Sequence, residues 1–360
     1  MKRIAVMTSG GDAPGMNAAI RAVIRMGRAL DLETFGIYRG YAGLIDGDIR
    51  PMLLRDVGGI IGRGGTILQS ARCKEFETPA GQDKAVANLR QQGIDGVVII
   101  GGNGTHKGAH ALVQLGLPLV TIPSTIDNDL CYTDVTLGVD TALNTLLDAI
   151  DRIRDTASAH RRAFLIETMG RDSGYLALMA GVAGGAEVIL IPEAPMKPSE
   201  VVDAIQDAYA RGKAHTIIVC AEGYKPGTQA LANYLKMRED ELGFTVRMTI
   251  LGHIQRGGSP TAFERLLATR FGMAAVQNLV QGNYGVMVGI VGNKIIATPI
   301  EKVVQCKKDV DLNFYDLANF LERGRIQPSS HLTAAGEPPS LQGTITVNLT
   351  KKEPEAIEER

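Results

Sequence analysis

The sequence predicts an α/β fold of two domains with similar design and mainly parallel sheets. Short apolar runs of strand length are followed by glycine-rich turns, where most of the 42 glycines fall. Helical segments separate these runs, so strands and helices alternate as parallel sheets require. The pattern restarts after a long helical segment, and 360 residues can form two hydrophobic cores.

The first half of the chain contains the clearest strand and helix units. Residues 4–8 predict a buried strand, followed by a glycine turn and a helix from Asn17 onward. The pattern returns with a strand at residues 97–100, a second glycine turn and a helix, and a third strand follows in residues 117–123. Residues 139–160 have apolar positions at the 3.6-residue period of an amphipathic helix, which we expect to bridge the domains.

The second half repeats this alternation. Apolar runs after residues 162, 187 and 215, and another at residues 248–251, predict strands, and helices are expected at residues 199–211 and 263–281. Gly292 and Asn293 lie between two apolar runs, which predicts a hairpin. The C-terminal residues are rich in Pro, Ser, Thr and Glu without apolar periodicity, and predict a mobile tail over residues 326–360.

Composition excludes several classes of protein. Lys and Arg number 38 against 39 Asp and Glu, so no overall charge attracts nucleic acid or an anionic membrane. Apolar runs are too short to span a bilayer, and no secretory signal precedes the first strand, so we expect a cytoplasmic protein. The four cysteines form no CxxC pair, which argues against a disulfide framework or a zinc site and predicts reduced thiols.

Two glycine-rich turns are candidate phosphate sites. Residues 9–15 and 101–105 each follow a predicted strand, where backbone N–H groups and a helix N-terminus favour an anion. For either turn alone, a purely structural role is about equally compatible with the pattern. Neither turn has the GxxxxGK[ST] spacing of a P-loop NTPase or the GxGxxG of a dinucleotide site, so a generic NAD-binding protein is disfavoured.

The third turn, at residues 123–129, carries two carboxylates. In an extended segment residues two apart share a face, so Asp127 and Asp129 can project into one crevice while Asn128 points elsewhere. Two such carboxylates suit phosphoryl transfer, in which one accepts the hydroxyl proton and the other helps to hold Mg²⁺. The alternative is a structural Asx turn, the more common reason for an Asp-rich turn.

Several arginines lie beside Gly or His in otherwise apolar surroundings. Arg suits phosphate because its planar fork donates paired hydrogen bonds, although a single Arg is usually exposed or salt-bridged. In residues 252–260, His253 and Arg256 lie between glycines after a predicted strand, which favours an anion site. The candidates are Arg72, Arg161, Arg162, Arg171, Arg247 and Arg256.

Taken in order, the motifs TSGGDAPGMNAAIR, RGGTIL, GGNGT, TIDND, MGRDSGY and LGHIQRGGSP resemble the bacterial-type phosphofructokinase family from Met1 to about Arg325. The resemblance implies two similar Rossmann-like three-layer domains with the active site in the cleft between them. It places residues 1–138 and about 255–305 in a nucleotide-binding domain, and residues 139–254 and about 306–325 in a sugar-phosphate domain. It implies a glycolytic kinase that moves the ATP γ-phosphoryl to the 1-hydroxyl of fructose 6-phosphate.

The resemblance also implies roles for single residues. Asp127 would be the base beside Thr125, Asp129 would act through Mg²⁺, and Arg72 and Arg171 would counter charge on the moving phosphoryl. The nucleotide site would be lined by Gly11, Arg72, Cys73, Gly102, Asn103, Gly104 and Thr105. Fructose 6-phosphate would be surrounded by Thr125, Asp127, Met169, Gly170, Arg171, Glu222, His253 and Arg256, with Arg162 and Arg247 reaching it from a neighbouring subunit. The resemblance thus implies a homotetramer that binds ATP, ADP and fructose 6-phosphate.

An effector site between subunits is a further implication. The matching residues are Arg21, Arg25, Arg154, Glu187, Arg211, Lys213 and His215. Gly58, Gly59 and Ala214 replace polar or charged residues of the family pattern, and Arg55 replaces an aromatic one. We therefore expect a retained anion site with altered effector preference.

Two positions depart from the family pattern at the active site. Asn103 stands where the family usually has Asp, and an amide is a weaker partner for Mg²⁺ than a carboxylate. Gly104 is typical of ATP users, whereas pyrophosphate users carry Asp there and Lys in place of Ser124. ATP is therefore the expected donor, and the alternatives are a pyrophosphate-dependent or mixed-donor enzyme and a regulatory, non-catalytic binding protein.

Overall fold

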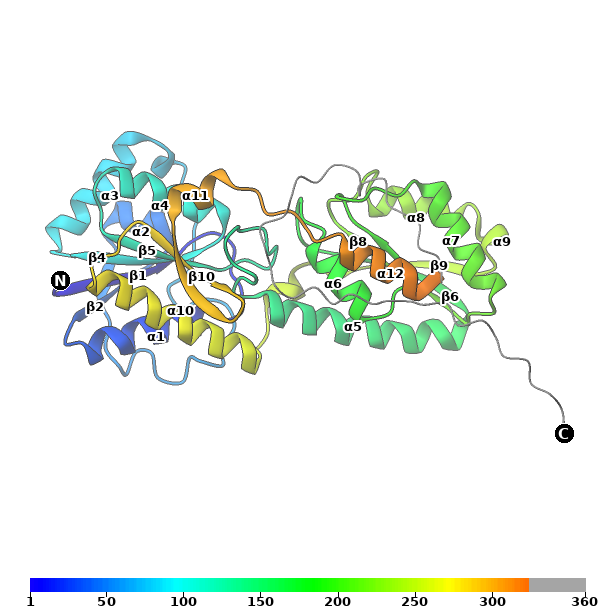
Figure 1. Ribbon diagram of the computed structural model, residues 1–360, viewed down its shortest axis with the longest axis horizontal. Helices are drawn as coiled ribbons and strands as arrows, with labels where there is room; N and C mark the ends of the chain where they lie inside the picture. The colour runs from blue at the N-terminus through cyan, green and yellow to red at the C-terminus, as the bar shows by residue number, and fades with distance from the viewer. Residues whose placement is uncertain (324–360) are drawn as a thin grey trace, which may run out of the picture.

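The computed structural model describes residues 1–323 and arranges them in two lobes, each built around its own sheet (Figure 1). Residues 326–360, predicted as a mobile tail, lie outside the described residues. Within those described, no helix combines the length and the apolar character that crossing a membrane requires.

The first lobe contains a seven-stranded sheet. Its strands follow the order β11 (Lys294–Pro299), β10 (Val286–Val291), β5 (Leu119–Pro123), β4 (Gly96–Gly101), β1 (Arg3–Thr8), β2 (Glu33–Ile37) and β3 (Ile49–Pro51). The five inner strands pair in parallel, and only the outermost strands β11 and β3 pair antiparallel. The predicted hairpin at Gly292 and Asn293 joins β10 to β11 and has positive φ at both residues, which confirms that prediction.

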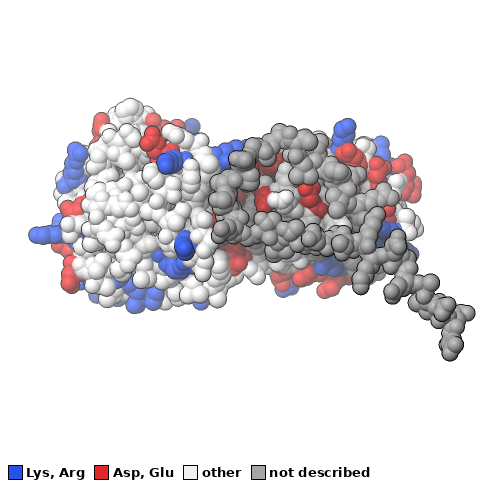
Figure 2. Space-filling model, in the orientation of Figure 1, with Lys and Arg blue, Asp and Glu red and all other residues white. Residues whose placement is uncertain are grey.

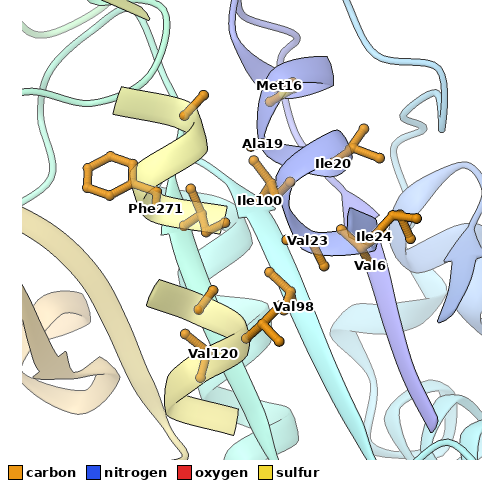
Figure 3. Packing of buried hydrophobic residues seen from close by; sticks show 14 of the residues in the cluster. Val6, Met16, Ala19, Ile20, Val23, Ile24, Val98, Ile100, Val120 and Phe271 are labelled. Carbon is orange, nitrogen blue, oxygen red and sulfur yellow. The ribbon is translucent and has the colours of Figure 1, made fainter. Parts of the chain in front are cut away.

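Helices cover both faces of this sheet (Figure 1). Alternation along β1 decides which side each residue faces: Ile4 and Val6 pack against α1 (Met16–Ala29) and α10 (Ala262–Val280), as Figure 3 shows for Val6. Ala5 and Met7 face the other side. That side is covered by α2 (Gly40–Asp46), the 3₁₀ helix η1 (Glu75–Glu77), α3 (Pro79–Gln91), α4 (Asn103–Gln114) and α11 (Ile300–Gln305).

The second lobe contains a four-stranded, fully parallel sheet in the order β7 (Val188–Leu190), β8 (Thr216–Ala221), β6 (Arg162–Thr168) and β9 (Thr245–Ile250). One face packs on α5 (Val139–His160), α6 (Tyr175–Ala183) and α12 (Asn313–Arg323), the other on α7 (Pro198–Ala210), α8 (Thr228–Lys236) and α9 (Glu239–Leu242). The predicted fold class, two Rossmann-like three-layer domains, is confirmed. The domain boundaries given above stay a prediction.

The expectation of four reduced thiols was wrong for one pair, because Cys131 and Cys306 form a disulfide with their Cα atoms 6.0 Å apart. The two lie 175 positions apart in the chain, so spacing in the sequence gave no signal. Their neighbours explain the approach, since Leu130 and Val303 share a small buried cluster with a residue of β10. Cys73 and Cys220 are free.

Reduction of this disulfide should destabilise the protein, because the bridge closes a long loop and so limits the unfolded chain. In the chain-entropy model the loss is about 5 kcal/mol. We expect dithiothreitol to lower the thermal midpoint of the wild type by several degrees, measured by calorimetry. The double variant Cys131→Ser/Cys306→Ser is the matched control: it should melt at the lower temperature with or without reductant. A wild-type thermal midpoint that does not change with reductant would contradict the presence of the disulfide.

Candidate active site

The candidate site forms where the carboxyl ends of strands from both sheets meet. In the first sheet β1 and β4 are neighbours whose following helices, α1 and α4, lie on opposite faces, and such a switch point leaves a crevice at the strand ends. The turn after β5 opens at the same edge because β5 runs parallel to β4. The second lobe contributes the turn after β6 and the 3₁₀ helix η2 (Gly252–Arg256) that follows β9.

A cleft of about 560 Å³ lies at this junction. It brings together thirteen of the predicted site residues: Gly11, Arg72, Cys73, Gly102, Asn103, Gly104, Thr105, Ser124, Thr125, Asp127, Asp129, Arg171 and Arg256. All but the last two belong to the first lobe. The nucleotide residues and the two carboxylates therefore line one wall of the cleft, and Arg171 and Arg256 face them from the second lobe.

The turn after β5 holds its two carboxylates in the predicted arrangement. Asn128 adopts a left-handed conformation with φ 48°, and its side chain bonds away from the cleft, donating to the carbonyl of Asp134 and accepting from the N–H of Thr136. Asp127 and Asp129, on either side, both line the cleft. The neighbouring Thr125 Oγ1 accepts the N–H of Asp127 at 3.2 Å. Asn128 therefore shapes the turn that presents both carboxylates.

Asp127 is a buried carboxylate, only 6% exposed. Its Oδ2 lies 3.8 Å from Nε of Arg171, and its Oδ1 has no hydrogen-bond partner among the described residues. Burial, and after it the negative charge of Asp129, raises the pKa of Asp127 to about 6, although Arg171 and Arg256 oppose the rise. A carboxylate of this kind is a stronger base than an exposed one and is still largely ionised at neutral pH.

Asp129 has one oxygen engaged and one free. Asn103, the first residue of α4, donates from Nδ2 to Oδ2 of Asp129 at 2.6 Å, whereas Oδ1 of Asp129 is buried without a partner in the described part of the chain. Buried carboxylate oxygens that lack partners suit a hard cation such as Mg²⁺. The residues present therefore fit a magnesium ion beside Asp129 that is completed by ligands from a bound phosphate.

The two glycine turns leave room for an anion. A Cβ at Gly11 would lie 2.8 Å from Nη1 of Arg256, so the guanidinium could come this close only to a glycine unless it shifted. A Cβ at Gly104 would meet nothing within 4 Å, which shows that Gly104 faces open space. Thr105 Oγ1 donates to the carbonyl of Ser9 and ties the two turns together. Both turns therefore present backbone to the same part of the cleft.

The second lobe orders its side of the site through two side-chain acceptors. Oε1 of Glu222 accepts the N–H groups of Gly170 and Arg171, at 3.1 and 2.6 Å. Oε1 of Gln255 accepts the N–H of Met169 at 3.1 Å. Arg171 itself has φ 53°, and its side chain, which is 67% exposed, reaches Asp127 in the other lobe.

Some predicted residues lie outside this cleft. Arg162 begins β6, at the end of the strand opposite to the site, and Arg247 lies on the exposed part of β9. His253 is exposed on η2. Neither Arg162 nor Arg247 is placed among the residues that line the cleft of its own chain.

The predicted effector residues form a partial cluster in the second lobe. Lys213 pairs with the buried carboxylate of Glu187 at 2.9 Å, and His215 Nδ1 lies 2.8 Å from Oγ of Ser158. Arg154 donates to the carbonyl of Gly184, and Arg211 pairs with Asp207. Arg21 and Arg25 lie on α1, in the other lobe.

Sequence reasoning did not select several residues that build the site. Tyr41 lines the cleft, stacks on Phe76 with ring centroids 4.0 Å apart, and donates to the carbonyl of Thr105. Gln255 is fully buried, although it stands inside a motif that was noticed for its neighbours. Glu264 on α10 accepts the N–H groups of Gly138 and Thr141 at the start of α5. A carboxylate at the start of an apolar helix was the only signal for Glu264.

The fold and the site together define a class of two-lobed α/β protein in which glycine turns, arginines and a buried basic carboxylate line one cleft at the ends of parallel strands. The phosphofructokinase family profile matches residues 3–279, and the chain belongs to the phosphofructokinase family.

Known proteins similar to this chain include the ATP-dependent 6-phosphofructokinase of Thermotoga neapolitana, 51% identical over 89% of this chain and 100% of that protein. The ATP-dependent 6-phosphofructokinase of Halalkalibacterium halodurans is 53% identical over 89% of this chain and 99% of its own length. Among solved structures, Pichia pastoris phosphofructokinase in the T-state superposes with TM-score 0.80 at 37% identity, over 84% of this chain and 35% of that one.

Replacing Asp127 with Asn should stabilise the fold, because the buried charge is disfavoured. The folded-state pKa is about 6 against an ordinary 3.8, so the penalty is absent below pH 4, grows between pH 4 and 6, and is complete above pH 6. A rise of this size in the pKa corresponds to roughly 2–3 kcal/mol in the free energy of unfolding. We expect Asp127→Asn to raise the thermal midpoint at pH 8 and to leave it nearly unchanged at pH 4. Asp83→Asn, on the exposed part of α3, controls for net charge; a lower midpoint for Asp127→Asn at pH 8 would refute the assignment.

Proposed function

We propose that this chain is an ATP-dependent 6-phosphofructokinase, which transfers the γ-phosphoryl of ATP to the 1-hydroxyl of fructose 6-phosphate in glycolysis. The observation that carries the proposal is the buried Asp127 carboxylate beside two glycine turns in one cleft. Support comes from relatives of that name that are about half identical over nearly their whole length.

Each of several residues in the cleft can take a separate role in the reaction. Asp127 accepts the proton of the 1-hydroxyl while the hydroxyl oxygen bonds to the γ-phosphorus. At the same time the bond from that phosphorus to the β-phosphate oxygen breaks, and ADP leaves. Thr125 lies beside the base, and Arg72 and Arg171 are placed to counter charge on the phosphoryl oxygens. The raised pKa of Asp127 suits a base that works near neutral pH.

Magnesium belongs to this proposal as well. Asp129 would hold the ion through its free Oδ1, together with phosphate oxygens of the nucleotide. When bound, Mg²⁺ neutralises charge on the phosphates. Asn103 keeps the other oxygen of Asp129 engaged, and Cys73 and the two glycine turns enclose the nucleotide.

Gly104 supports ATP as the donor. The space beside Gly104 is open, so a nucleotide phosphate can approach where an Asp side chain would repel it. Ser124, on the same wall, supplies no charge for pyrophosphate. The runner-up is a pyrophosphate-dependent or mixed-donor enzyme.

For the sugar, we propose a site shared between subunits of a homotetramer. Met169, Gly170, Glu222, His253 and Arg256 would surround fructose 6-phosphate. Arg162 and Arg247 would reach its 6-phosphate from a neighbouring subunit, which is consistent with their position away from the cleft of their own chain.

An exposed apolar stripe on α10 supports association. Phe263, Leu266, Met273 and Val280 recur at helical spacing and are 48%, 67%, 41% and 47% exposed, respectively. Figure 2 shows a largely uncharged surface over α10 and β10.

The proposal also covers regulation and location. The cluster of Arg154, Glu187, Lys213 and His215 would bind an anionic effector with help from Arg21, Arg25 and Arg211. A shift of the fructose 6-phosphate saturation curve by ADP or phosphoenolpyruvate would support that site, and no shift with either would count against it. A cytoplasmic location is the expected one for a glycolytic enzyme.

The donor prediction is tested with purified protein, Mg²⁺ and fructose 6-phosphate. We expect fructose 1,6-bisphosphate with ATP and none with pyrophosphate, measured by coupled assay of the product. Asp127→Ser is the matched control and should lose about 10²–10⁴-fold in turnover with little change in sugar affinity. Product with pyrophosphate would favour the runner-up, and no product with either donor would favour a regulatory binding protein.

The tetramer prediction is tested on the α10 stripe. Leu266→Glu places a charge at its most exposed apolar position, so we expect dimers or monomers by analytical ultracentrifugation and weaker fructose 6-phosphate binding. Leu115→Glu, at the end of α4, adds the same charge elsewhere and should leave the mass unchanged. A tetramer of normal mass in Leu266→Glu would exclude this surface as an interface.

A further inference from the structure

The contact between Asn103 and Asp129 has a defined polarity. An ionised carboxylate accepts hydrogen bonds and donates none, so the amide group that faces Oδ2 of Asp129 at 2.6 Å is the NH₂ of Asn103. Asn103 starts α4 and Asp129 follows β5, so the bond joins the turns after two neighbouring strands. The side chain of residue 103 therefore presents a donor, and not a metal ligand, to this carboxylate.

The bond also decides which oxygen of Asp129 is available. Oδ2 is engaged by the amide, while Oδ1 is buried and has no hydrogen-bond partner among the described residues. A buried carboxylate oxygen without a partner is costly unless a cation or water completes it. The Asn103 amide thus holds the carboxylate with Oδ1 open.

Acidic charge in direct contact with Asp129 is limited, although Asp12 and Glu77 also line the cleft and the Lys308 ammonium interacts with Asp129. Asp127 and Asp129 are the carboxylates of the turn, and the side chain in contact with Asp129 is a neutral amide. Mg²⁺ is commonly held by one or two carboxylates together with substrate phosphates, and its affinity for a protein rises with the number of charged ligands. The turn supplies two carboxylates, and one of them is needed as the base. Most of the negative charge that neutralises the cation must therefore come from the phosphates.

We propose that Asn103 is a positioning residue that orients Asp129 toward the cation and, because it adds no charge, makes cation binding depend on the nucleotide. The cation then enters with the nucleotide and does not occupy the free protein. This proposal rests on the proposed phosphoryl-transfer function for the identity of the phosphates, but its metal-binding part is measured without turnover.

The test is a titration of the full-length protein with Mn²⁺ in place of Mg²⁺, followed by the electron paramagnetic resonance signal of free Mn²⁺. Asn103→Asp keeps the size of the side chain and places a second carboxylate against Asp129. Without nucleotide we expect it to bind Mn²⁺ at least about tenfold more tightly than the wild type. With a non-hydrolysable ATP analogue present, the difference should shrink to about threefold or less. Asp129→Asn should abolish the gain when combined with Asn103→Asp.

Two results would overturn the dependence on nucleotide. One is wild-type protein that binds Mn²⁺ without nucleotide as tightly as with the analogue. The other is equal affinity of wild type and Asn103→Asp in the absence of nucleotide, with both proteins folded by their melting curves.

The positioning role is tested by kinetics on Asn103→Ala, which removes the donor but no charge. We expect turnover to fall roughly 10–100-fold, as for other outer ligand contacts, with the KM for fructose 6-phosphate within about twofold of the wild type. Wild-type turnover in Asn103→Ala would refute the role. Suppose that the wild type makes no fructose 1,6-bisphosphate but Asn103→Asp tightens Mn²⁺ binding. That result would refute the proposed kinase reaction and still support the role of Asn103 beside Asp129 in cation binding.

Discussion

The buried carboxylate of Asp127 is the constraint on which the rest of the site depends. Taking a charge out of water is unfavourable, and here a second carboxylate lies two residues away and also disfavours ionisation. Only partial compensation is present, since the nearest guanidinium nitrogen is 3.8 Å away on the exposed Arg171. The free protein therefore retains a base whose proton affinity is raised by its surroundings.

Such a group stays in place only if the backbone around it is firmly held. The side chain of Asn128 hydrogen-bonds to the backbone of Asp134 and Thr136 in the loop that follows. In the same loop, Thr133 Oγ1 accepts the N–H of Ile290 on β10. Lys308 donates to the carbonyls of Thr133 and Asp134, in the segment that also carries the disulfide cysteine Cys131. The carboxylate turn is thus anchored to β10 and to the chain that leaves α11.

The sequence predicted the elements with strong periodicity and the turns with special chemistry. Strands at residues 4–8 and 97–100 and the helix over residues 139–160 were expected because burial imposes a repeat on them. Residues 33–37 and 49–51 form strands that were not expected, since β3 is a short edge strand held by pairing with β2. The grouping of the carboxylate and glycine turns in one cleft was implied only by the family resemblance, and the structure explains it because parallel strands end at one edge of the sheet.

Contacts between segments far apart in the sequence, including one that joins the two lobes, could not be predicted. Glu264, in the first lobe, holds the first turn of α5, and Gln255 on η2 accepts from Met169 after β6. Neither contact has a local pattern, because each joins residues more than 80 positions apart. Burial raises the pKa of Glu264 to about 7, even though three donors surround it, so this joint also holds a disfavoured charge.

The distance between base and counter-charge depends on the same joint. Asp127 belongs to the first lobe and Arg171 to the second, and the 3.8 Å separation spans the boundary between them. A small change in the angle between the lobes would move the guanidinium relative to the carboxylate, and Coulomb attraction in a partly buried cleft is sensitive to such a change. The strength of the base is therefore coupled to the arrangement of the two lobes.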